Sequence, residues 1–156
     1  MLGLRFAHYC ANPGENRFDA AVAIDSSGYL DRNEWFRRLA ALLRPGGRVF
    51  IVDCFLGRPE YEEQFNLHWH TCIGTIDEYL IAAREEGLRS DLIHDISHRT
   101  EHFWTTTLEL IQAERQEKQL SEFDRIQQEA SLNAHALVRE GLCNGGLSYA
   151  LMSFSR

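Results

Sequence analysis

The sequence lacks the features of a membrane, secreted or nucleic-acid-binding protein. No apolar run approaches the roughly 20 residues of a membrane-spanning helix, and the first residues lack a signal peptide's basic-then-apolar order. Lysine and arginine number 16 against 23 acidic residues, which gives a net charge of −7. An acidic chain is a poor partner for nucleic acid or an anionic membrane. We therefore expect a cytoplasmic protein that binds neither.

The sequence also has little that would bind a metal. The four cysteines are far apart with no C-x-x-C pair, so in the cytoplasm they are expected to be free thiols. His98 and His102 are four residues apart and could share a helix face, an arrangement that can bind zinc. No H-E-x-x-H motif accompanies them. We expect no metal site, and a zinc-dependent protein is the weakest alternative.

What is present is an alternation of strand and helix patterns on the scale of one domain, with no repeat or linker in its 156 residues. The expected strands are Leu4–Ala7, Phe18–Ile24, Arg48–Asp53, Leu88–Ile96 and Leu147–Phe154. Between them, helical patterns run from Asp31 to the stop at Pro45, then over Ile76–Glu86, Thr100–Gln119 and Ser121–Glu140. This order predicts an α/β fold with crossover connections, a doubly wound sheet.

Local signals mark the helix ends. Asp31 and Thr75 are each followed three residues later by glutamate, the spacing of a capping box. Gly87 and Gly141 follow helical patterns and are expected to stop them. The "LRPGG" stretch ends a helix because proline cannot continue it, and it leads directly into the strand Arg48–Asp53.

Three stretches carry a family resemblance. "FDAAVAIDSSGYLDRNEWFRRLAALLRPGGRVFIVD" (Phe18–Asp53) resembles the middle of a Rossmann-like S-adenosylmethionine-dependent methyltransferase. "FNLHWHTCIGTIDEYLIAAREEGL" and "ISHRTEHFW" are similar to the small-molecule branch that contains geranyl diphosphate C-methyltransferase, and sterol and tocopherol methyltransferases share the layout. The resemblance implies a partial Rossmann-like sheet with family strands 3 to 7, the last antiparallel. The chain would be the C-terminal part of a methyltransferase domain, with substrate-pocket helices within 58–140.

The front of that family pattern has no counterpart here. The first strand, the glycine-rich loop and the acidic residue that ends the second strand are missing. The chain is then a truncated piece, one half completed by a second chain, or a non-catalytic remnant. Without strands 1 and 2, Ala20–Ile24 would form an open sheet edge, which invites pairing. We expect a homo-oligomer or a complementing chain.

The resemblance implies S-adenosyl-L-methionine as the cofactor. His8 and Tyr9 fall at the position that contacts adenine, and Asp25, Ser26 and Ser27 fall beside the methionine part. The carboxyl end of a strand is where open α/β sheets bind ligands. The plainer alternative for "DSSG" is a turn that caps a helix.

The resemblance also implies catalytic roles. Asp25 would remove a proton after methyl transfer to carbon, and the Trp69 ring would stabilise the intermediate cation. For a hydroxyl substrate, His68 or His70 is the better base. The expected substrate-binding residues are Tyr29, Phe65, Asn66, Trp69, Phe103 and Trp104. Alternatively, Phe65 and Trp69 form the buried face of an amphipathic helix.

The favoured function is methyl transfer from S-adenosylmethionine to a small lipophilic, terpenoid-like metabolite, with carbon as the methylated atom. One alternative is a non-catalytic interaction subunit built on a methyltransferase remnant. Another is an O- or N-methyltransferase of a natural product. All of them require Ile24 to lie alongside Val52 in parallel strands.

Overall fold

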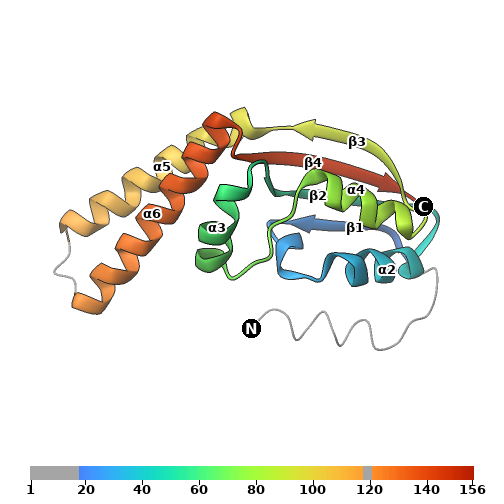
Figure 1. The fold of residues 1–156 in the computed structure, drawn as a ribbon, viewed down its shortest axis with the longest axis horizontal. Coiled ribbons are helices and arrows are strands. Elements are labelled where there is room, and N and C mark those ends of the chain that lie inside the picture. The colour runs from blue at the N-terminus through green and yellow to red at the C-terminus, as the bar shows by residue number, and fades with distance from the viewer. Residues whose placement is uncertain (1–17, 118–120) are drawn as a thin grey trace. The chain divides into compact units, whose positions relative to one another are not determined.

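The computed structural model describes residues 18–117 and 121–156. The elements are β1 (Phe18–Ile24), η1 (Ser27–Tyr29), α2 (Arg32–Leu42), β2 (Leu43–Leu56), η2 (Pro59–Tyr61), α3 (Glu62–Trp69), α4 (Ile76–Glu85), β3 (Arg89–Asp95), α5 (Ser97–Glu117), α6 (Glu122–Asn144) and β4 (Leu147–Ser155) (Figure 1). The strand expected at Leu4–Ala7 and the adenine-contacting residues expected at His8 and Tyr9 lie outside the described residues.

The described chain forms two compact units. The first unit comprises 18–53, 74–94 and 150–156, and the second comprises 54–73 and 95–149. The first holds most of the sheet together with α2 and α4, and the second holds α3, α5 and α6. Among the described helices, none combines the length and apolar character needed to cross a membrane.

The strands form one sheet in the order β1-β2-β4-β3. β1 and β2 are parallel, and Ile24 lies opposite Val52, as the sequence predicted. β4 runs in the opposite direction to β1 and β3 (Figure 1). The expected α/β class with an antiparallel last strand is therefore confirmed.

The two expected helix starts differ in detail. Thr75 forms a full capping box, because its side chain accepts from the Glu78 N–H and the Glu78 carboxylate accepts from the Thr75 N–H. Asp31 accepts from the Glu34 N–H at 2.8 Å. The Glu34 carboxylate bonds Arg37 and Arg38 instead of returning to the cap, so only half of this box is made.

The boundaries of two elements differ most from the sequence prediction. β2 begins at Leu43 and ends at Leu56, so it is longer than the expected Arg48–Asp53. The expected stop at Gly141 is wrong, because α6 continues to Asn144 and ends at Gly145, whose φ is 75°. A Cβ on Gly141 would lie 2.8 Å from Leu147 Cγ. This glycine permits a close approach within the second unit, and Gly145 supplies the left-handed cap.

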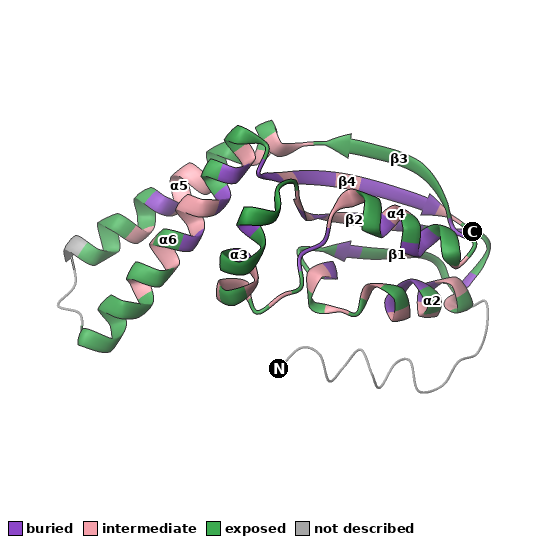
Figure 2. Cartoon of the chain, in the orientation of Figure 1, coloured by how far each residue is buried: buried purple, intermediate pink, exposed green. Residues whose placement is uncertain are grey.

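The strands differ in how far they are covered. Most of β4 is buried, whereas in β1 Ala23 is the one buried residue (Figure 2). In the core of the first unit, the Phe36 ring of α2 lies 6.1 Å from the Tyr79 ring of α4 and 5.4 Å from the Phe154 ring of β4. Val49 and Ile51 of β2 are fully buried. This core fixes the strand ends on which the first group of candidate site residues lies.

Candidate functional site

The first candidate group is the loop that follows β1. Asp25 continues the strand ladder by donating its N–H to the Val52 carbonyl at 3.0 Å, but its φ is +46°. A left-handed backbone is uncommon for a residue other than glycine, and aspartate and asparagine adopt it more readily than most. Asp25, Ser26 and Tyr29 are exposed, whereas Ser27 is buried. The loop thus presents a carboxylate and a hydroxyl at the carboxyl end of the sheet.

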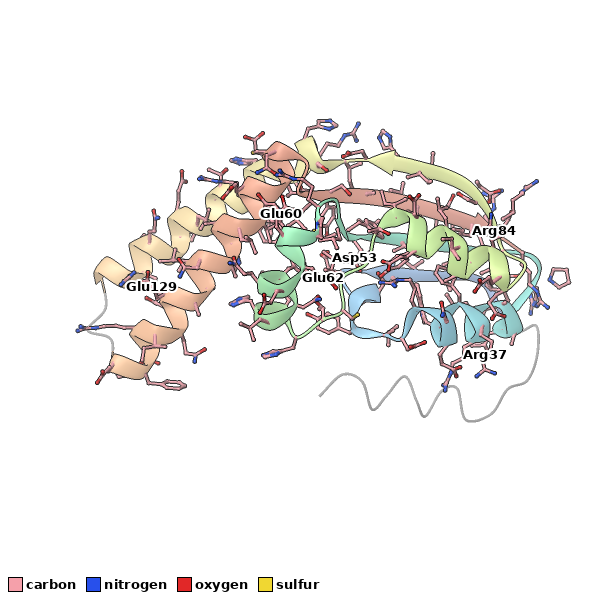
Figure 3. The ribbon with its side chains drawn as sticks, viewed as in Figure 1. Arg37, Asp53, Glu60, Glu62, Arg84 and Glu129 are labelled. Carbon is pink, nitrogen blue, oxygen red and sulfur yellow. The ribbon has the colours of Figure 1, made fainter. Side chains whose placement is uncertain are left out.

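A buried carboxylate fixes this loop. Asp53, near the end of β2, accepts three hydrogen bonds on its Oδ2 atom: from Ser26 N at 3.1 Å, Ser27 N at 2.8 Å and Ser27 Oγ at 2.6 Å. Figure 3 labels Asp53 close to the end of β1. Hydrogen bonds to an ionised acceptor are stronger than neutral ones. Asp53 therefore fixes the backbone directly after Asp25.

Tyr79 of α4 extends the network. Its hydroxyl lies 2.8 Å from Ser27 Oγ. Burial raises the pKa of Tyr79, and the hydrogen bond with Ser27 offsets part of that rise. The Arg32 guanidinium carbon lies 4.7 Å from the centre of the Tyr79 ring. A Cβ on Gly74 would clash with this guanidinium group at 1.8 Å, so Arg32 occupies its position because residue 74 is glycine.

The second candidate group is in the second unit. We call His68 and Trp69 of α3, Trp104 of α5 and His135 of α6 the aromatic–histidine cluster. The His135 ring lies 5.3 Å from the Trp69 ring and 5.6 Å from the Trp104 ring, and the two indole rings lie 6.4 Å apart. The His68 ring meets the Trp69 ring edge-on at 4.7 Å. Residues from three helices therefore converge on one half-buried cluster.

Polar atoms in this cluster are unusual for a core. Both indole nitrogens, Nε1 of Trp69 and Nε1 of Trp104, are buried and have no hydrogen-bond partner. Partial burial lowers the pKa of His68, and the neighbouring His135 and His70 lower it further. His135 Nδ1 lies 2.7 Å from the Ser131 carbonyl oxygen. Because a carbonyl accepts hydrogen bonds and cannot donate them, Nδ1 carries the proton and Nε2 of the neutral ring is an acceptor.

The other expected substrate residues in this unit have mixed surroundings. Phe65 is buried in a core with Tyr61 and Val138, and Trp69 packs against that core. The side-chain oxygen of Asn66 accepts the Ile73 N–H at 2.7 Å, so it closes the turn after α3. The Phe103 ring is exposed and packs edge-on against Trp104.

The structure thus brings the predicted residues together in two groups. Asp25, Ser26, Ser27 and Tyr29 belong to the first unit. His68 and the expected substrate residues Phe65, Asn66, Trp69, Phe103 and Trp104 belong to the second unit. Their roles stay predictions. Within the described part of the chain, no three His, Cys, Asp or Glu side chains are arranged to hold a metal ion.

Sequence reasoning missed Asp53, Tyr79 and His135. Asp53 carried a usable signal, because it is a polar residue near the carboxyl end of a strand beside β1. Tyr79 and His135 lie within helices where nothing in the local pattern separates them from ordinary amphipathic positions. Their contacts depend on helix packing, which the sequence does not give.

The chain has the Rossmann-like fold of S-adenosylmethionine-dependent methyltransferases, as the resemblance predicted. Geranyl diphosphate C-methyltransferase from Streptomyces coelicolor A3(2), solved with Mg²⁺, geranyl diphosphate and S-adenosyl-L-homocysteine, superposes with a TM-score of 0.71. It is 20% identical, and the match covers 94% of this chain and 52% of that one. Haemonchus contortus phosphoethanolamine N-methyltransferase 2, in complex with S-adenosyl-L-methionine, has a TM-score of 0.73 at 14% identity, covering 93% and 34%.

In sequence, the chain is similar to a particular curated protein. It is 28% identical over 144 residues to 27-O-demethylrifamycin SV methyltransferase of Amycolatopsis mediterranei (strain S699). This match covers 87% of this chain and 52% of the relative. The chain therefore spans about half the length of the curated relative that it matches. No protein-family model matches the sequence.

Proposed function

We propose that this chain is the C-terminal part of an S-adenosylmethionine-dependent methyltransferase that acts on a small lipophilic metabolite of natural-product biosynthesis. The observation that carries the proposal is the loop after β1, where Asp53 holds Ser26 and Ser27 by three hydrogen bonds and Asp25 is left-handed. Left-handed residues other than glycine often occur at functional sites, and aspartate is one of the residues that adopt this conformation.

The exposed groups of this loop suit the cofactor. The amino acid end of S-adenosylmethionine carries an ammonium and a carboxylate, which the Asp25 carboxylate and the Ser26 hydroxyl can bind. The cofactor supplies the methyl group on its sulfonium. Asp25 and Ser26 would orient that end at the carboxyl edge of the sheet, which is where ligands bind in open α/β folds.

The residues allow two kinds of acceptor atom. For carbon, an alkene attacks the methyl group and Asp25 accepts the proton that is lost from the resulting cation. For oxygen, a neutral His68 would accept the hydroxyl proton as the methyl group is transferred. The lowered pKa of His68 supports the second route, because the base must be neutral to act.

We also propose that β1 pairs with a further polypeptide segment, from a complementing chain or a second copy. β1 is an edge strand of the described sheet. Val22 and Ile24, on the face of β1 opposite Ala23, are 66% and 61% exposed. Parallel strands are normally covered on both faces, and an apolar edge invites pairing. The same exposed face favours the alternative of an interaction subunit without catalysis.

Calorimetric titration of the chain with S-adenosylhomocysteine separates the two functions. We expect binding in the micromolar range, weakened about tenfold or more in Asp25→Asn, which keeps the left-handed preference but removes the charge. Asp19→Asn, at an exposed position of β1, is the matched control and should bind as the parent does. If no heat is released at a high concentration of S-adenosylhomocysteine, the methyltransferase proposal is contradicted and the non-catalytic interaction subunit is favoured.

Sedimentation tests the pairing of β1. We expect a dimer or larger assembly, and Val22→Lys combined with Ile24→Lys should dissociate it, because lysine on an edge strand opposes pairing. Leu67→Lys, at a position that is 75% exposed on α3, is the control. A monodisperse monomer of the parent chain contradicts self-association.

A further inference from the structure

The aromatic–histidine cluster has hydrogen-bonding groups that the folded chain does not use. Nε1 of Trp69 and Nε1 of Trp104 are buried donors without acceptors. Buried donors are nearly always satisfied in folded proteins, so two in one cluster call for an explanation. Simple core packing would not need them, because phenylalanine fills similar space with no polar atom.

The same cluster also offers an acceptor. Because His135 Nδ1 donates to the Ser131 carbonyl, Nε2 is the ring nitrogen that is available to accept a hydrogen bond. This ring packs against both indole rings, at 5.3 Å from Trp69 and 5.6 Å from Trp104. A molecule that both accepts from an indole N–H and donates to an imidazole would use these groups together.

We propose that the aromatic–histidine cluster binds the hydroxyl group of a lipophilic alcohol or phenol. The hydroxyl oxygen accepts from the indole N–H groups, and the O–H donates to His135 Nε2. The aromatic rings contact the apolar body of the ligand. The binding of this alcohol does not depend on the proposed function. The further step, that the alcohol is the methyl-accepting substrate and that its oxygen is methylated, rests on the proposed function.

A bound cation fits the cluster less well. Cations bind over the faces of aromatic rings. Here Trp69 meets both Trp104 and His135 in edge-to-face geometry, with interplanar angles of 74° and 64°. In each pair the edge of one ring covers a face of the other, so that face is not open to a cation. Indole N–H groups carry partial positive charge, which suits an oxygen and repels a cation.

The test is a heteronuclear NMR titration of the ¹⁵N-labelled full chain, following its three indole N–H signals. Trp35 belongs to the first unit and serves as the internal control. The probes are 2-naphthol, 2-methoxynaphthalene, naphthalene and tetramethylammonium. We expect 2-naphthol to shift the signals of Trp69 and Trp104 and not that of Trp35. It should bind about tenfold more tightly than 2-methoxynaphthalene, which cannot donate.

Two variants separate hydrogen bonding from packing. His135→Phe keeps a ring but removes the acceptor, so 2-naphthol should lose its advantage over 2-methoxynaphthalene. Trp104→Phe removes one donor and should weaken binding of both oxygen-bearing probes about tenfold. His102→Phe, at an exposed position of α5, is the control and should change neither.

Three results would overturn the proposal. These are equal binding of naphthalene and 2-naphthol, tighter binding of tetramethylammonium, or no shift of either cluster signal at the solubility limit of 2-naphthol. None of them bears on cofactor binding, which the S-adenosylhomocysteine titration measures separately. The two proposals can therefore fail independently.

Discussion

The two candidate groups use buried polar atoms in opposite ways. In the first unit, the Asp53 carboxylate, the Ser27 hydroxyl and the Tyr79 hydroxyl bond one another. In the second unit, the indole nitrogens of Trp69 and Trp104 are buried without partners. A satisfied network makes a backbone rigid, whereas the unsatisfied indole N–H groups are the ones that the proposed ligand would bind.

This difference separates stability from binding. Substitutions in the first network should lower the free energy of unfolding, because each one leaves a buried partner unsatisfied. Substitutions in the aromatic–histidine cluster should change ligand binding more than stability.

The largest effect is expected for Asp53→Ala. It removes the acceptor of three hydrogen bonds from Ser26 and Ser27, so we expect a loss of about 3 kcal/mol in the free energy of unfolding. Asp19→Ala breaks an exposed ion pair with Arg44 and should lose less than about 1 kcal/mol. Urea unfolding measures both. Similar midpoints for the two variants would show that Asp53 does not hold the loop.

Gly141→Ala tests the close approach inside the second unit. The added methyl group would meet Leu147 Cγ at 2.8 Å, so we expect a loss of about 2 kcal/mol, although alanine favours a helix. Asn133→Ala, exposed on the same helix, should be neutral or slightly stabilising. A stabilised Gly141→Ala variant would mean that α6 does not pack on Leu147.

Tyr79→Phe removes one hydroxyl from the first network. We expect a loss of about 1 kcal/mol, because Ser27 Oγ loses one partner and keeps Asp53. Because burial raises the pKa of Tyr79, the free energy of unfolding of the parent chain should fall above about pH 10, where Tyr79 ionises in the unfolded chain first. Tyr79→Phe should lack this fall. Tyr29→Phe, on the exposed side of the loop, is the control for unfolding below that pH.

The smallest effect is expected for His68. Its pKa is lowered, so the unfolded chain binds a proton at a higher pH than the folded chain does. This contribution to stability is present above about pH 6.5 and is lost as pH falls through the folded pKa. His68→Gln should flatten the decline in urea midpoint over that interval. Leu67→Gln carries no titratable group and should leave the decline unchanged.

Local patterns predicted the framework of the first unit. The apolar run Phe18–Ile24 became β1 with the same bounds, and Thr75 with Glu78 formed the expected capping box. The parallel pairing of β1 with β2 also follows from local signals, because a helix between two strands favours a crossover connection.

Long-range contacts lay beyond the sequence pattern. Ser27 and Asp53 are 26 residues apart, and Ser27 and Tyr79 are 52 apart, so no periodicity relates them. Gly141 has the signal of a helix stop, yet its role is set by Leu147, which follows the next turn. His135 has no distinguishing neighbour in the sequence, and it becomes a candidate only when α3 and α5 bring the Trp69 and Trp104 rings against it.

The order of the sheet has a consequence for synthesis on the ribosome. β4 lies between β2 and β3, yet it follows both of them and the long helices α5 and α6 in the chain. Until residues 147–155 have emerged, β2 and β3 have no strand between them and their facing backbone groups are unpaired. A translational pause in α5 or α6 would prolong that exposure, so the nascent chain should depend on chaperones most strongly just before β4 appears.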